Sequence, residues 1–223
     1  MPHPLRFTAA AAILMIAALP AASEQAPETP QIVIEQEGKV TKVSVGGGGW
    51  EGVIEAVQKL RELPADKSAQ VVDVLQKNMD ALPPAYIYEL ARRTCTSDPD
   101  RAVYLFNLAG SRARYDAFRC VDETAQEGIA ATLMSLPMPE CKALGDTAKM
   151  VAALKKLRTS KEQFASTASP WWICSHGMAA VMAGLMNQSL ATSEWEKPKA
   201  EWDTAKREVV DGIDETINKH SGE

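Results

Sequence analysis

The chain has 223 residues, of which 46% are hydrophobic and 24% are charged, and its formal net charge is −5 at pH 7. This length and apolar content suit one domain with a hydrophobic core of its own. The mildly acidic balance disfavours nucleic acid as a partner, because the phosphate backbone attracts basic surfaces.

Residues 1–23 have the pattern of a secretory signal peptide. A short start that contains Arg6 precedes the apolar run FTAAAAILMIAAL, and small residues follow up to Ser23. The run is shorter than the roughly 20 residues that span a membrane, which disfavours the alternative of a retained anchor. We therefore predict a periplasmic or secreted protein with no stable membrane insertion once the signal is removed.

Residues 24–49 are predicted to form a polar linker, a small β-hairpin and a Gly-rich joint. Apolar and polar residues alternate through QIVIEQEGKVTKVSV, with Glu37-Gly38-Lys39 at its centre, which is typical of a hairpin. The four glycines at 46–49 precede Trp50 and lack the Lys-Ser or Lys-Thr pair of a phosphate-binding loop. We interpret them as a flexible joint.

Residues 50–223 show helical periodicity almost throughout, which predicts an all-α domain of helical hairpins. Helices are expected on both sides of Pro64, over 84–118, after the caps Asp122 and Asp146, from Pro170 and from about Pro198. The segment WWICSHGMAAVMAGLMNQSL is expected to be one markedly apolar helix. Its methionines are interpreted as core filler, with a Met-rich partner-binding surface as the alternative.

The hairpin over residues 84–120 is expected to organise this bundle. Pro84 suits the first turn of its first helix, and Asp98 with Pro99 specifies the start of its second. The second helix carries a stripe of mainly small residues that allows another helix to approach closely. This stripe comprises Ala102, Leu105, Phe106, Ala109, Ala113 and Ala117.

Two resemblances follow from these residues. The Ala102-x-x-x-Phe106-x-x-Ala109-Gly110 helix behind Leu90-Ala91 resembles one tetratricopeptide-type repeat unit, with no second copy at a period of about 34 to 36 residues. The pairing of Arg-Cys-x-Asp at 119–122 with Trp-x-Cys-x-His-Gly-Met at 172–178 resembles uncharacterised proteobacterial envelope proteins. The second resemblance implies an envelope location and no particular activity.

The four cysteines are predicted to form two disulfides, as an even count in an exported chain indicates. Cys95 lies at the turn of the hairpin and Cys120 at the far end of its second helix, about 27 Å away at about 1.5 Å per residue. Bonded cysteines need Cα atoms about 4.4–6.8 Å apart, so these two cannot pair. A helix that returns antiparallel after Asp122 brings Cys141 beside Cys95, which favours Cys95–Cys141 and Cys120–Cys174.

Few residues suggest catalysis. His176 is the one histidine of the mature core, since His3 leaves with the signal and His220 lies in a polar tail. Cys174 and His176 would point to different faces of a helix, whereas a nucleophile and its base must be in contact. We interpret His176 as a structural histidine, and we expect no cofactor and no metal.

Two groups of residues are candidates for partner contact. They are Trp171 with Trp172, and the basic residues Arg112, Arg114 and Arg119, which we expect on a solvated face paired with nearby acids. The predicted function is a non-catalytic, exported protein that binds another envelope protein, as an adaptor or an immunity-like inhibitor. The alternative is an envelope hydrolase that uses His176. The shortage of histidines and the lack of a G-x-S-x-G motif favour the first.

Overall fold

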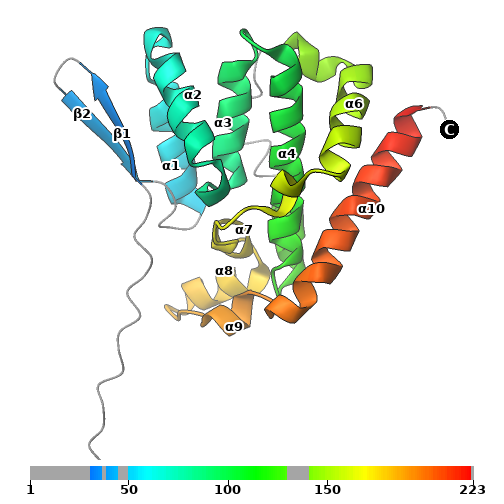
Figure 1. Ribbon diagram of the computed structural model, residues 1–223. Helices are drawn as coiled ribbons and strands as arrows, with labels where there is room; N and C mark the ends of the chain where they lie inside the picture. Colours follow the sequence, from blue (N-terminus) through cyan, green and yellow to red (C-terminus); the bar gives the residue numbers. More distant parts are fainter. Residues whose placement is uncertain (1–30, 37–38, 45–49, 130–140, 222–223) are drawn as a thin grey trace, which may run out of the picture.

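The computed structural model describes residues 31–36, 39–44, 50–129 and 141–221 (Figure 1). The predicted signal peptide and the glycines at 46–49 lie outside the described residues. The mainly helical fold expected after residue 50 is confirmed. The α-helices are α1 (Trp50–Arg61), α2 (Ser68–Lys77), α3 (Pro84–Thr94), α4 (Pro99–Phe118), α6 (Thr147–Arg158), α7 (Trp171–Cys174), α8 (Met178–Leu185), α9 (Thr192–Trp195) and α10 (Trp202–Ser221). Short 3₁₀ helices connect them: η1 (Ala65–Lys67), η2 (Met79–Ala81), η3 (Glu123–Glu127), η4 (Lys142–Gly145), η5 (Lys161–Phe164) and η6 (Lys199–Glu201).

The helices are arranged around α4, the long helix near the centre of Figure 1. α3 packs antiparallel on one side of α4 and α6 packs on the other, with α10 as an outer layer against α6. α1 and α2 lie against α3. α7, α8 and α9 form a lobe, here called the α7–α9 lobe, near the C-terminal end of α4.

A two-stranded ribbon precedes the helices. β1 (Gln31–Gln36) pairs antiparallel with β2 (Lys39–Ser44), and the register places Gln31 opposite Ser44 and Gln36 opposite Lys39. The ribbon runs beside α1 and α2 (Figure 1). Because an isolated two-stranded ribbon is marginally stable in water, it depends on such a neighbour.

α4 is buried on nearly every side, which makes it the centre of the core. The stripe of small residues predicted from the sequence is buried, apart from the partly exposed Phe106. Large side chains on the other faces are buried as well: Val103, Tyr104, Leu108 and Tyr115. The predicted start of the helix is confirmed, because the Asp98 side chain accepts a hydrogen bond from the Arg101 N–H at 2.9 Å.

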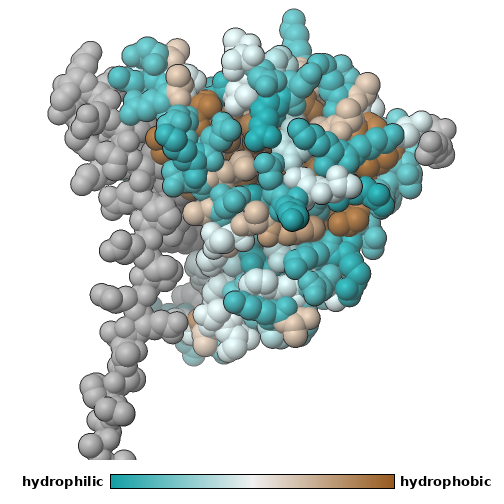
Figure 2. Space-filling model, in the orientation of Figure 1, coloured by the Kyte–Doolittle hydropathy of each residue, from teal (hydrophilic) through white to brown (hydrophobic). Residues whose placement is uncertain are grey.

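The outer helices bury one face each, as amphipathic sequences predict. α10 turns a stripe at four-residue spacing toward the bundle, made of Ala205, Val209, Ile213 and Ile217. Fully burying a valine or isoleucine side chain is worth about 1.5–3 kcal/mol, so this stripe holds α10 in place. The face of the molecule in Figure 2 is mainly hydrophilic, with small separate hydrophobic areas.

The segment after Pro170 is not the single helix that its apolar sequence predicted. It forms α7 and α8, separated at residues 175–177. Gly177 is extended, with φ −61° and ψ 146°, and a Cβ at this position would come within 2.8 Å of the Asp122 Oδ2. Asp122 therefore occupies the space of a side chain at 177, and its carboxylate also accepts a hydrogen bond from the Ala179 N–H at 2.7 Å. The contacts at this break come from a residue distant in the sequence, so helical periodicity does not reveal them.

The helix predicted after Asp122 is a 3₁₀ helix over most of its described part. Asp122 caps η3 by accepting a hydrogen bond from the Thr124 N–H at 3.0 Å. Residues 130–140, which include the predicted apolar positions Leu133 and Met134, lie outside the described residues.

Candidate functional site

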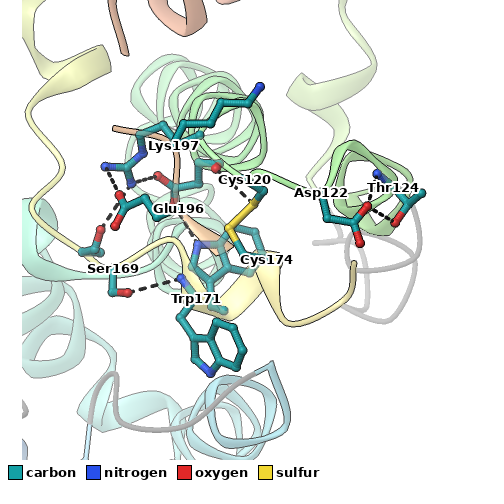
Figure 3. Close-up of a disulfide and its surroundings, with 12 residues drawn as sticks. Cys120, Asp122, Thr124, Ser169, Trp171, Cys174, Glu196 and Lys197 are labelled. Atoms are coloured by element: carbon teal, nitrogen blue, oxygen red, sulfur yellow. Dashed lines mark hydrogen bonds and ion pairs between the residues drawn. A yellow bond between two sulfur atoms is a disulfide. The ribbon is translucent and has the colours of Figure 1, made fainter. Parts of the chain in front are cut away.

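Two disulfides tie the helices, and they join the cysteines that the helix order had paired. The Cα atoms of Cys95 and Cys141 are 5.8 Å apart, and those of Cys120 and Cys174 are 5.3 Å apart. The first bond links the end of α3 to the start of η4. The second links the end of α4 to α7 and is buried at the base of the α7–α9 lobe (Figure 3).

The segments 119–122 and 172–178, which the sequence analysis singled out together, lie side by side. Besides the Cys120–Cys174 bond, which Figure 3 shows, the side chains of Asp122 and Thr124 accept hydrogen bonds from the first two N–H groups of α8. The Thr124 Oγ1 accepts a hydrogen bond from the Met178 N–H at 2.9 Å. Capping of this kind satisfies N–H groups that a helix start leaves without partners. The N-terminus of α8 is therefore fixed to the body of the protein.

A buried ion pair between Asp116 and Arg119 contacts α7 through Trp172. Asp116 is fully buried, and its carboxylate accepts hydrogen bonds from Arg119 Nη2 and from Trp172 Nε1, both at 2.7 Å. Burial raises the pKa of Asp116, and the Arg119 charge and the Trp172 N–H partly offset that effect. The Arg119 guanidinium carbon also lies 4.8 Å from the ring centre of Tyr115 and 4.7 Å from that of Trp202.

This arrangement corrects the prediction for two of the partner-contact candidates. Arg119 and Trp172 are 3% and 2% exposed, so they cannot meet a partner at the surface of this structure. The physical reason is that Asp116 satisfies both the guanidinium charge and the indole N–H inside the protein. Asp116 itself was not predicted from the sequence as part of a site.

Arg112 is also internal, so the expected solvated basic face is wrong for this residue too. Its guanidinium donates to the Met79 carbonyl oxygen at 2.8 Å and to the Glu162 carbonyl oxygen at 2.6 Å, and it pairs with Asp80 at 2.6 Å. These bonds hold η2 and η5 against α4. Arg114 is the member of the predicted basic group that is exposed.

His176 is partly buried at the break between α7 and α8. Burial lowers its pKa, and a Cβ added at Gly128 would come within 3.1 Å of the His176 Cβ, so the two residues pack closely. Cys174 offers no thiol while it is bonded to Cys120. Across the described ranges, no group of three or more His, Cys, Asp or Glu side chains is placed to hold a metal ion.

α8 exposes an apolar stripe, which contradicts the prediction that its methionines fill the core. In the part of the chain that the structure describes, six large apolar side chains are exposed, and five belong to this stripe, with Val121 as the sixth. Their spacing of three and four residues places them along one side of the helix. Ala183 is the one buried residue of α8. The α8 stripe comprises Met178 (56% exposed), Val181 (43%), Met182 (43%), Leu185 (78%) and Met186 (57%).

Trp171, the remaining partner-contact candidate, is partly exposed in the same lobe. Its ring packs against that of Trp195 in α9, with 5.1 Å between ring centres. Figure 3 shows its side chain directed away from the disulfide. Of the five candidates, Trp171 and Arg114 therefore reach the surface, and Trp171 is the one that belongs to the α7–α9 lobe.

Comparison with protein-family models, with curated proteins and with solved structures finds no match for this chain. Among the described segments, each helix is too short or too polar to cross a membrane. Function is therefore inferred from the chain's own surface, where the α8 stripe holds most of the exposed large apolar side chains of the described residues.

Proposed function

We propose that this chain is an exported, non-catalytic protein that binds another envelope protein through the α8 stripe, as an adaptor or an immunity-like inhibitor. The exposure of five large apolar side chains on one side of α8 carries the proposal. A contiguous exposed apolar patch is typical of a surface that a partner covers. The signal-like N-terminus and two disulfides fit an oxidising compartment outside the cytoplasm.

The α8 stripe can supply a useful part of a binding free energy. Fully burying a leucine or methionine side chain is worth about 1.5–3 kcal/mol, and the stripe residues are roughly half exposed. A partner that covers all five would gain roughly 5 kcal/mol from them, before the cost of association. Other contacts around the stripe must provide the remainder of a stable complex.

Contacts with the rest of the protein also keep α8 helical before a partner binds. A helix of eight residues is unstable in water on its own, because nucleation is costly and few hydrogen bonds repay it. Here Asp122 and Thr124 cap its first turn, and the Cys120–Cys174 bond anchors the chain four residues earlier. A partner therefore meets a helix that is already formed, which reduces the entropic cost of binding.

A photo-activatable cross-linking amino acid tests the proposal directly. Placed at Met182 in cells that export the protein, it should give a discrete covalent adduct with one envelope protein. The same amino acid at Lys77, an exposed position on α2, is the matched control and should give none. Adding Leu185→Ser to the Met182 variant should reduce the adduct. The absence of any adduct from positions 178, 182 and 185 of the folded, exported protein would contradict the proposed function.

A further inference from the structure

The surroundings of the α8 stripe are acidic. The sequence contains no Lys or Arg between residues 120 and 141 or between 162 and 196. Asp122 lies at the N-terminus of α8, next to the exposed Glu123, and Glu127 is exposed at the end of η3. Glu194 of α9 is exposed as well. Acidic side chains thus lie at the N-terminus of the α8 stripe and in the neighbouring elements η3 and α9, and the segments that contain them carry no Lys or Arg.

The α7–α9 lobe itself contains no Lys or Arg. Of the basic residues nearest in the sequence, Arg119 is buried in its pair with Asp116, and Lys197 lies beyond the end of α9. Within the lobe, His176 is the one residue that could become cationic, and burial lowers its pKa, which favours the neutral form at pH 7.

We propose that the occupant of the α8 stripe is an apolar groove on a partner protein whose rim carries Lys or Arg side chains. This inference rests on the proposed function and adds the chemistry of the partner. A helix with anchors at three- and four-residue spacing suits a groove lined by apolar side chains. Basic groups at the rim would then be attracted to the acidic residues of η3 and α9, which gives specificity and speeds association.

A second copy of this chain is a poorer occupant. Two α8 stripes facing each other would bring together two lobes that contain Glu194 and no Lys or Arg, and like charges across an interface disfavour association. At about 100 Å² for each side chain, the stripe offers on the order of 500 Å², so a symmetric pair would bury on the order of 1,000 Å². Stable interfaces usually bury about 1,200–2,000 Å². A groove encloses the helix on several sides and buries more of it.

An anionic lipid surface is also a poorer occupant. Helices that lie on membranes usually carry Lys and Arg on their polar side, which anionic headgroups attract. In η3 and α9, the exposed charges of Glu123, Glu127 and Glu194 have the opposite sign. The same negative charge would repel an anionic membrane and attract a groove whose rim carries Lys or Arg.

The test uses the oxidised, exported protein and two synthetic helical hairpins with the same Leu-lined groove, one rimmed by Lys and the other by Glu. Binding is followed by fluorescence anisotropy of labelled hairpins. The Lys-rimmed hairpin should bind about 10-fold or more tightly than the Glu-rimmed one at low salt, and the difference should largely disappear at about 0.5 M salt. Leu185→Ser should weaken binding about 10-fold.

Matched charge variants distinguish the effect of the acidic residues in η3 from that of acidic residues elsewhere on the surface. Glu123→Gln with Glu127→Gln should weaken binding of the Lys-rimmed hairpin several-fold at low salt, whereas Glu62→Gln with Asp66→Asn, in the connection between α1 and α2, should not. Equal binding of both hairpins would overturn the proposal. So would stripe-dependent self-association in sedimentation, or stripe-dependent binding to phosphatidylcholine vesicles. An adduct from Met182 in cells would leave the proposed function standing in each of these cases.

Discussion

Removal of the Cys120–Cys174 bond, by Cys120→Ala with Cys174→Ala, should lower the free energy of unfolding by about 4 kcal/mol. The bond closes a loop of 54 residues, and the chain entropy lost from the unfolded state grows with the logarithm of loop length, which gives about 4 kcal/mol here. Domains are typically stable by about 5–15 kcal/mol, so the variant should unfold at a much lower urea concentration. The bond also anchors α7, so its removal should destabilise the adjacent helix α8 as well.

The matched control is Cys95→Ala with Cys141→Ala, which opens a loop of 46 residues. It should lower the free energy of unfolding by a similar amount, about 4 kcal/mol. Urea unfolding followed by circular dichroism measures both losses. Hydrogen exchange then distinguishes the variants, because the first should speed exchange of the α8 amides and the second should not. A loss below about 1 kcal/mol in the first variant, or unchanged exchange in α8, would refute this reasoning. Non-reducing peptide mapping checks the linkage itself, and a Cys120–Cys141 fragment would refute it.

Three further predictions follow from the buried groups and the ribbon. Asp116→Ala should cost about 3–5 kcal/mol in urea unfolding, because Arg119 stays buried without its carboxylate, and a loss below about 1 kcal/mol would contradict the buried pair. His176→Gln should cost about 1–3 kcal/mol through poorer packing. Burial lowers the pKa of His176 in the folded protein from 6.5, so the stability of the wild type should fall as the pH drops from 6.5 toward that lower pKa, whereas the stability of the variant should not. A melting temperature that the substitution leaves unchanged would count against a structural role. Deletion of residues 24–46 should leave the melting temperature nearly unchanged, and a large fall would place the ribbon in the core.

Features that depend on neighbours in the sequence could be predicted. Asp98 and Asp146 each lie before a helical run, and each accepts a hydrogen bond from the N–H three residues later. The inward stripe of α10 also follows from its own periodicity. The cysteine pairing followed from helix order and length, since Cys95 and Cys120 lie too far apart to bond each other.

Features that depend on distant residues could not be predicted in this way. Arg112 follows Leu105 and Leu108 at helical spacing, so its position in the sequence places it on the same face of α4 as two buried leucines. The carbonyl groups that bind its guanidinium belong to η2 and η5, which the sequence of α4 does not indicate. For α8, periodicity locates an apolar side without saying whether the bundle covers it. The answer depends on the break at Gly177, where Asp122 packs and bonds from another segment.

The most direct test of the central claim is a comparison of methionine oxidation in the isolated protein and in intact envelopes. Met178, Met182 and Met186 are exposed in the structure, whereas Met79 is 8% exposed and serves as the internal control. Hydrogen peroxide converts accessible methionines to sulfoxides, which peptide mass spectrometry counts. The three α8 methionines should oxidise much faster than Met79 in the isolated protein and should be protected in envelopes that contain the partner. Equal oxidation of these three residues in both preparations would contradict the claim that a partner covers the α8 stripe.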